Sequence, residues 1–247
     1  MGKARLDHFL VEHGYCPSRA QARKLILDGH VKLHGEIVRK PSLNCSLETP
    51  LEITRPDVSY VSRGGEKLAH GLGVSGFSAV GVTALDLGAS TGGFTDVLLQ
   101  NGARQVVAID VGHGQLSPVL ASDRRVTNLE KCNARHLRQE DLPSGCRPDA
   151  IVCDVSFISL TLALPPAMSL VQTGAWMIAL IKPQFEVGRQ GLGKSGVVKD
   201  ADLHDAVCDK ITDFVTHQSG WRVTGLTPSP ILGPKGNQEF LIAAQKG

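Results

Sequence analysis

A short stretch around residue 90 combines glycines with acids in a way that suits a small-molecule site. It reads LDLGASTGGFTD, with Asp86 before Gly88 and a glycine pair at Gly92 and Gly93. Glycine lets the backbone turn tightly and pass close to a ligand. Asp110 follows roughly 20 residues on, the spacing at which a carboxylate accepts both hydroxyls of a bound ribose. The stretch therefore predicts either a dinucleotide or S-adenosylmethionine.

The chemistry of the loop distinguishes these two cofactors. A dinucleotide site requires G-x-G-x-x-G, so that backbone amides face a pyrophosphate, whereas GASTGG lacks the second glycine at its place and has an acid just upstream. S-adenosylmethionine has no phosphate, and its cationic centre is favoured beside a carboxylate. We therefore expect S-adenosylmethionine rather than NAD, with a glycine turn in an empty α/β domain as the other alternative. The residues expected to contact the cofactor are Asp86, Gly88, Ser90, Gly92, Gly93, Phe94, Asp110 and Asn133.

Four further ionisable residues lie at the ends of predicted strands. Lys67 precedes the first core strand, Asp154 follows the fourth, Lys182 follows the fifth, and Glu239 lies at the last. Each alone is more typical of a surface ion pair. The segment DVSF after the fourth strand lacks the proline pair of enzymes that methylate base amines, which favours a ribose hydroxyl as acceptor. Because the attacking oxygen must be aimed and lose its proton, we predict that Lys182 is the base or hydroxyl-activating group and that the other three position it and the substrate.

The segment 188–195, GRQGLGKS, matches the pattern of a phosphate-binding loop. Such a loop must leave a strand directly and open into a helix. Here KPQFEV separates the apolar run 175–181 from the first glycine, and the first convincing helix start is at Asp200 or Asp202. We interpret the segment as a glycine-rich surface loop rather than an ATP or GTP site.

The composition is typical of a cytoplasmic globular protein. Of the 247 residues, 42% are hydrophobic, and no apolar run approaches the roughly 18 residues of a membrane span. The start MGKARLDHFL lacks the apolar centre of a signal peptide. The six cysteines form no C-x-x-C pair and are expected to be reduced. A zinc site of His13, Cys16, His30 and Cys45 fits no standard finger, so no metal is predicted.

The net charge of +2 is unevenly distributed. Residues 1–45 carry eight lysines and arginines against four acids, which indicates a polyanionic partner, with a solvated helix face as the alternative. The same region predicts one helix ending at Gly14, a second capped by Ser18, and a hairpin around His34 and Gly35.

The pattern changes after residue 54. Pro56 and the pair Gly64–Gly65 mark a linker over 55–62. Apolar runs such as VTALDLGA and PDAIVCDVS then alternate with helical patterns such as TGGFTDVLLQNG, which predicts a mostly parallel, doubly wound sheet over 63–247. No helix separates WRVTGLTPSP from EFLIAAQK, so we expect the last strand to be antiparallel.

Residues 3–54 closely resemble the ribosomal-protein S-four type of RNA-binding domain. The Arg-Leu-Asp start, Ser-Arg before the second helix and the hairpin carry the resemblance, and only His34 departs from the usual asparagine. It implies a small α+β domain over 1–54 that binds RNA. The cations expected near RNA are Lys3, Arg5, Arg19, Arg23, Lys24 and, beyond the linker, Arg63.

The order Lys-Asp-Lys-Glu within SRGGEKL, CDVSF, IKPQFEVGR and NQEFLI resembles the FtsJ-like ribose 2′-O-methyltransferases. The whole chain is similar to the TlyA haemolysin-type rRNA methyltransferase family, although Tyr60 stands where some relatives have tryptophan. The resemblance implies a Rossmann-like fold with a seven-stranded sheet, S-adenosylmethionine as donor, and a cytidine ribose of ribosomal RNA, within ribosomal subunits, as acceptor. A non-catalytic rRNA-binding assembly factor and a pore-forming haemolysin are the alternatives, and the oligomeric state is left open.

Overall fold

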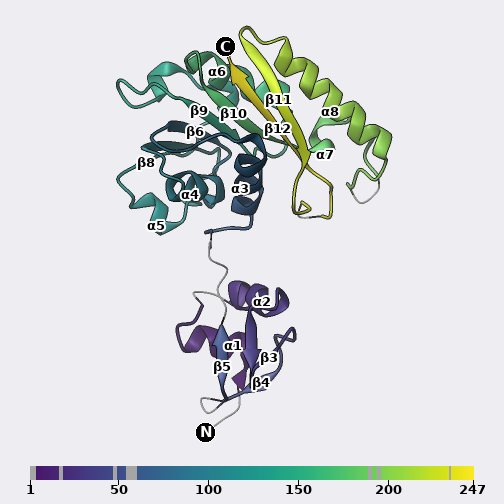
Figure 1. The fold of residues 1–247 in the computed structure, drawn as a ribbon. Helices are drawn as coiled ribbons and strands as arrows, with labels where there is room; N and C mark the ends of the chain where they lie inside the picture. Colours follow the sequence, from purple (N-terminus) through teal and green to yellow (C-terminus); the bar gives the residue numbers. More distant parts are fainter. Residues whose placement is uncertain are drawn as a thin grey trace. The chain divides into compact units, whose positions relative to one another are not determined.

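The computed structural model describes residues 4–16, 19–46, 49–53, 60–188, 191–193, 196–233 and 235–247, with residues 20, 21 and 24 described by their backbone alone. The chain divides into two compact units, Met1–Ser59 and Tyr60–Gly247 (Figure 1). The second unit begins within the segment 55–62 that the sequence suggests as a linker.

The first unit has the two helices and the hairpin expected from the sequence. Its elements are β1 (Ala4–Arg5), α1 (Leu6–Glu12), α2 (Arg19–Leu27), β2 (Val31–Leu33), β3 (Glu36–Ile37), β4 (Asn44–Cys45) and β5 (Leu51–Ile53). The sheet order is β3-β2-β5, and β1 pairs separately with β4. The hairpin turns at His34 and Gly35, whose φ angles of 52° and 82° are those that a two-residue turn of this kind requires. Leu6, Leu10 and Ile26 are fully buried in its core.

The second unit contains a seven-stranded sheet with the order β11-β12-β10-β9-β6-β7-β8. Its strands are β6 (Thr83–Leu87), β7 (Gln105–Ile109), β8 (Val126–Leu129), β9 (Ala150–Cys153), β10 (Trp176–Ile181), β11 (Trp221–Pro228) and β12 (Phe240–Lys246). Strands β6 to β10 pair in parallel, and β12 runs antiparallel to β10 and β11. The prediction of a mostly parallel sheet with an antiparallel last strand is confirmed.

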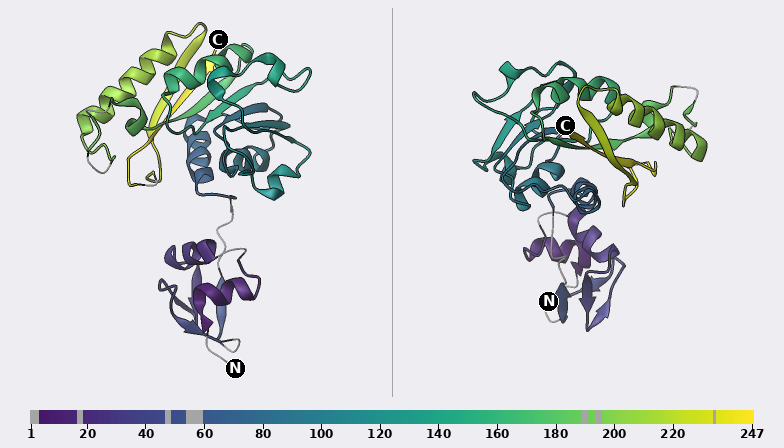
Figure 2. Two further views of the ribbon diagram at one scale, coloured as in Figure 1. Left: turned by 180° about the vertical axis from the view of Figure 1, so that it is seen from behind. Right: turned by 45° about the horizontal axis from the view of Figure 1, so that its top comes forward.

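Helices cover both faces of this sheet. Helices α3 (Gly64–Ser75), α4 (Gly93–Gln100) and α5 (Pro118–Ala121) pack on one face, and α6 (Leu160–Leu170) and α8 (Ala201–Thr216) on the other. Figures 1 and 2 show this layering from opposite sides. Successive residues of a strand point to opposite faces of the sheet. Ala84 therefore packs with α3 and α4, whereas Leu85 packs with α6 and α8. The short helices η1 (Ala134–His136), η2 (Gln139–Asp141) and α7 (Pro183–Glu186) complete the unit.

The strand order places the candidate site at one edge of the sheet. Strand β6 lies between β7 and β9, so the strand order reverses at β6. In doubly wound sheets, ligands bind at the carboxyl ends of the strands at such a point. Because β12 is antiparallel, it begins beside the end of β10, with Phe240 opposite Ile181. The start of β12 therefore joins the ends of β6, β9 and β10.

Candidate active site

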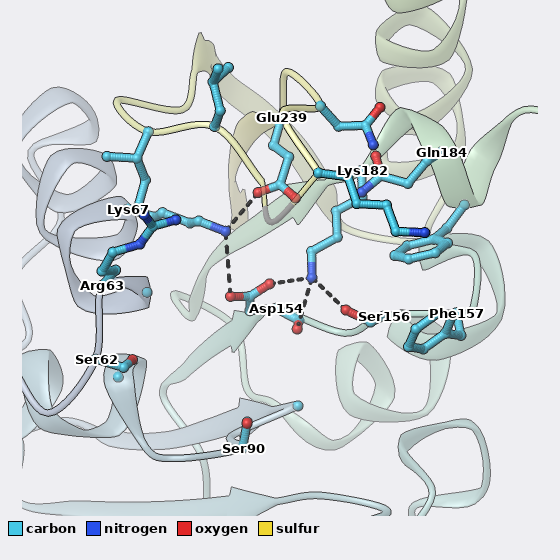
Figure 3. A pocket seen from close by; sticks show the side chains of 18 of the residues that line it. Ser62, Arg63, Lys67, Ser90, Asp154, Ser156, Phe157, Lys182, Gln184 and Glu239 are labelled. Carbon is cyan, nitrogen blue, oxygen red and sulfur yellow. Dashed lines mark hydrogen bonds and ion pairs between the residues drawn. The ribbon is translucent and has the colours of Figure 1, made fainter. Parts of the chain in front are cut away.

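A cavity of about 750 Å³ opens at this edge of the sheet, a size typical of small-molecule sites. Figure 3 shows it from close by. Of the residues singled out in the sequence, it is lined by Arg63, Lys67, Gly88, Ser90, Gly93, Phe94, Asp154, Lys182 and Glu239. The loop after β6 and the strand-end residues thus belong to one cavity.

The four strand-end residues form one ion cluster. Lys67 Nζ lies 2.6 Å from Glu239 Oε2 and 3.9 Å from Asp154 Oδ2. Lys182 Nζ lies 2.6 Å from Asp154 Oδ1, and it also donates a hydrogen bond of 2.8 Å to Ser156 Oγ. Both lysines and Glu239 are buried, and Figure 3 shows the two ammonium groups converging on Asp154. The predicted grouping is therefore present in the structure.

Each member of the cluster is placed by the end of a different element. Asp154 follows β9 and Lys182 follows β10, two neighbouring parallel strands that end at the same edge. Glu239 directly precedes β12, which begins at that edge because it is antiparallel. Lys67 lies in the first turns of α3. Residues separated by up to 172 positions in the chain thereby come within hydrogen-bonding distance.

The loop after β6 requires glycine where other backbone passes close by. Gly88 has a φ of +81°, and a Cβ there would lie 3.0 Å from the backbone of Asp154. A Cβ at Gly93 would collide with the hydroxyl of Ser62 and lie 3.0 Å from Gly65 N. Gly92, with a φ of +95°, packs against leucine side chains. The glycines thus let the loop lie against the segments before α3 and after β9.

Asp86 is fully buried in β6, although the sequence suggested that it contacts the cofactor. Thr95 Oγ1 donates a hydrogen bond of 2.6 Å to Asp86 Oδ2, while Oδ1 has no partner among the described residues. Burial raises the pKa of Asp86 from 3.8 to about 7, outweighing the hydrogen bond from Thr95 that lowers it. Asp86 is not among the residues that line the described cavity.

Asp110 and Asn133 have local partners of their own. The Asp110 carboxylate accepts hydrogen bonds from the backbone N–H of Ser90, at 2.8 Å, and of Gly112, at 2.7 Å. Asn133 Oδ1 accepts from the N–H of Arg135 at the start of η1. In the part of the chain that the structure describes, neither side chain lines the cavity. Asp110 nevertheless fixes the loop at Ser90, which does line it.

Two of the predicted RNA-binding cations are held by a buried acid of the first unit. Arg5 Nε and Arg19 Nη2 lie 3.0 and 3.1 Å from the Asp7 carboxylate, whose side chain is fully buried. Burial alone raises the pKa of Asp7, but the hydrogen bonds from both arginines outweigh it and hold the pKa at about 2. Arg23 is exposed. Lys3 and the side chain of Lys24 lie outside the described residues.

The sequence reasoning missed an aromatic pair at the cavity. Phe157 is 90% exposed and has a φ of +66°, a strained conformation for a non-glycine residue. Its ring centroid lies 5.0 Å from that of Phe185, tilted by 49°. Ser156 and Gln184 also line the cavity. The available signal was that DVSF and KPQF each carry phenylalanine three residues after a predicted site residue.

Two family models match the chain. The FtsJ-like methyltransferase model matches residues 60–246, and the S4 domain model matches residues 4–49. In the described residues, no helix is both long and apolar enough to cross a bilayer.

Several named proteins are similar over nearly the whole chain. The 16S/23S rRNA (cytidine-2′-O)-methyltransferase TlyA of Mycobacterium tuberculosis is 42% identical over 245 residues, which cover 97% of this chain and 89% of that protein. Hemolysin A of Brachyspira hyodysenteriae is 38% identical over 237 residues, or 96% of this chain and 98% of that one. A solved structure from Streptococcus thermophilus, described as a hemolysin, superposes with a TM-score of 0.75 at 40% identity, covering 100% of this chain and 89% of the other.

Proposed function

Because this chain belongs to the FtsJ-like methyltransferases, and within them to the TlyA family, we propose that it methylates a ribose 2′-hydroxyl of ribosomal RNA. The methyl donor is S-adenosylmethionine, and the nucleoside is cytidine, the one in the name of the Mycobacterium tuberculosis relative. The observation that carries the proposal is the cluster of Lys67, Asp154, Lys182 and Glu239 in the same cavity as the glycine loop.

The residues present fit S-adenosylmethionine, which supplies an electrophilic methyl group when bound. Ser90, Gly93 and Phe94 lie in the cavity wall and would hold it. A Cβ at Gly93 would prevent the close packing of the loop against the start of α3. The oxygens of Asp110 each keep a lone pair beside the backbone N–H that they accept, so they can also accept from ribose hydroxyls. The two acids of the cavity wall, Asp154 and Glu239, suit a cationic ligand.

Lys182 is aimed by its neighbours. Its Nζ contacts Asp154 Oδ1 and Ser156 Oγ, and its third and longest contact is to the Asp154 carbonyl oxygen, at 3.4 Å. A neutral Lys182 can give up this weakest contact and turn its lone pair to the attacking hydroxyl, whose proton it accepts. Asp154 then pairs with the ammonium that forms.

The other pair positions the substrate. Lys67 is held by Glu239 Oε2, while Glu239 Oε1 is buried and has no hydrogen-bond partner among the residues described. Glu239 also belongs to the cavity wall, where it fixes the Lys67 ammonium beside Asp154. Phe157 and Phe185 both line the same cavity, and aromatic side chains stack on unpaired RNA bases.

The first unit supplies RNA affinity. We assign residues 1–54 to RNA binding, 55–62 to a linker and 63–247 to catalysis, in the cytoplasm, where ribosomal subunits are available. The exposed Arg23 and the outer faces of Arg5 and Arg19 can contact phosphates, because pairing with Asp7 leaves about half of each of these two side chains exposed.

The test is methyl transfer to ribosomal RNA by the full chain and by Lys182→Ala. With radiolabelled donor and ribosomal subunits, the wild type should transfer methyl groups, and mass spectrometry should locate them on ribose. Lys182→Ala should lower turnover at least ~100-fold, because a general base contributes a factor of this order, while calorimetry should give nearly unchanged donor affinity. Lys210→Ala, outside the cavity, is the matched control.

Near-normal turnover by Lys182→Ala would refute its role as the base. A wild type that binds RNA but transfers no methyl group to subunits or to naked RNA would identify an RNA-binding assembly factor instead.

A further inference from the structure

Glu186 connects three helices next to the segment 154–159, which follows β9. It is the last residue of α7, and its side chain is 1% exposed. Its Oε2 accepts a hydrogen bond of 2.7 Å from Ser159 Oγ and pairs with Lys210 Nζ of α8 at 2.9 Å. Its Oε1 accepts from Leu160 N, also at 2.7 Å. Both oxygens of a buried carboxylate are therefore held by short contacts.

Two of these contacts fix the beginning of α6. Ser159 is the N-cap of that helix, with Oγ accepting from Thr161 N, and Leu160 is its first residue. The first amides of a helix have no partner within the helix, and a carboxylate there is further stabilised by the helix dipole. Glu186 therefore acts as a second cap on α6 and determines where the segment 154–159 ends.

The segment 154–159 is thereby attached along its whole length to the stretch from Lys182 to Glu186. Its beginning contacts Lys182 at 2.6 and 2.8 Å, the tilted rings of Phe157 and Phe185 pack together in its middle at 5.0 Å, and its end is held by Glu186. The left-handed φ of Phe157 is strained, and such a conformation persists only where the surroundings hold it. On the side of α6, Glu186 supplies the attachment nearest to Phe157.

We propose that Glu186 is a positioning residue for the target nucleoside. By fixing the end of the segment 154–159, it holds Phe157 at the mouth of the cavity and keeps Asp154 and Ser156 on Lys182. Glu186 is not part of the described cavity wall, so it acts through this segment. The identity of the nucleoside rests on the proposed function, whereas the effect on Phe157 does not.

The matched variants separate this role from simple helix pairing. Glu186→Ala removes all three side-chain contacts, and Ser159→Ala removes one contact to α6. Lys210→Ala leaves both contacts to α6 and removes the ion pair to α8, together with the hydrogen bond of 3.1 Å from Lys210 Nζ to the Glu186 carbonyl oxygen. In the full chain, Glu186→Ala should lower kcat/KM for RNA about 10- to 100-fold, because a displacement of about 1 Å costs this much. The loss should include a rise in the KM for RNA, because Phe157 is displaced, with donor affinity within about 2-fold of the wild type. Ser159→Ala should lie between, Lys210→Ala should match the wild type, and Glu186→Gln, which keeps an acceptor oxygen, should recover part of the loss.

A second measurement is independent of turnover. In protein labelled with 4-fluorophenylalanine, the ¹⁹F resonance of Phe157, assigned with Phe157→Leu, should shift or broaden in Glu186→Ala and stay unchanged in Lys210→Ala. An unchanged resonance and an unchanged KM for RNA in Glu186→Ala would overturn the proposal. If that variant loses donor binding through misfolding, Ser159→Ala decides by the same two measurements. A wild type without methyl transfer, but with the expected resonance changes, would remove the proposed function and leave the positioning role intact.

Discussion

Replacing Asp86 with asparagine isolates the free-energy cost of burying a carboxylate beneath the glycine loop. Asp86 is fully buried, is hydrogen-bonded through one oxygen to Thr95, and has a pKa raised by burial from 3.8 to about 7. Asparagine has nearly the same shape, can still accept from Thr95 Oγ1, and does not ionise. The Asp86→Asn variant should therefore be more stable than the wild type at alkaline pH.

The size and pH range follow from the shifted pKa. Below about pH 4 the carboxyl is protonated in both the folded and the unfolded state, so it makes no difference to stability. Between about pH 4 and 7 the unfolded state ionises first, and the wild type loses about 1.4 kcal/mol of stability per pH unit. Above about pH 7 the loss is constant, at about 4 kcal/mol. From pH 5 to pH 8, the variant should therefore gain about 3 kcal/mol relative to the wild type.

Urea unfolding followed by tryptophan fluorescence measures this in the second unit alone. The chain has 2 tryptophans, Trp176 and Trp221, and both are buried in the second unit. Asp209→Asn, the same change at an exposed site on α8, should show no such pH-dependent gain. If the stabilities of Asp86→Asn and the wild type ran parallel from pH 5 to pH 8, Asp86 would ionise in the fold without cost and the reasoning would be wrong.

Two further substitutions, one in each unit, test the contacts of Gly93 and Asp7. Gly93→Ala should destabilise the second unit by roughly 1–3 kcal/mol and weaken donor binding measured by calorimetry, because its Cβ would meet Ser62 and Gly65. As a control, Gly73→Ala should stabilise α3 slightly, because no described atom lies within 4 Å of its Cβ. Asp7→Asn should destabilise the first unit by roughly 1.5–3 kcal/mol at pH 7, measured by hydrogen exchange of α1 and α2. Its effect should shrink as the pH falls from about 4 towards 2, because the lowered pKa of Asp7 means that the wild type loses the same interactions in that range.

The ion cluster of Lys67, Asp154, Lys182 and Glu239 was accessible from the sequence because it depends on topology. Alternating strands and helices predict a parallel sheet, and parallel strands end at one edge, so Asp154 and Lys182 were expected at the same edge. The absence of a helix before the last strand predicted its reversal, which carries Glu239 to the same edge. Asp200, suggested as a helix start, caps α8 by accepting from Asp202 N at 3.0 Å.

Other features depend on tertiary contacts that have no local signature. An aspartate before a glycine loop can be exposed or buried, and only the packing of the sheet shows that Asp86 is fully buried. The left-handed conformation of Phe157 reflects attachments at both ends of its segment rather than the residue type. The contacts of Glu186 to Ser159 and Leu160 join positions 27 and 26 residues apart, with a whole helix and strand between them.

The charges of the cluster explain why Lys182, rather than Lys67, is assigned as the base. Two lysines and two carboxylates balance each other, so removing any one leaves a buried charge without its partner, and loss of activity alone does not identify the proton acceptor. The contacts do distinguish the two lysines. Lys67 is committed to Glu239, which is fully buried, at 2.6 Å. Lys182 pairs with Asp154, which is less buried, and it also has the weaker contact to a carbonyl that it can exchange for a substrate hydroxyl.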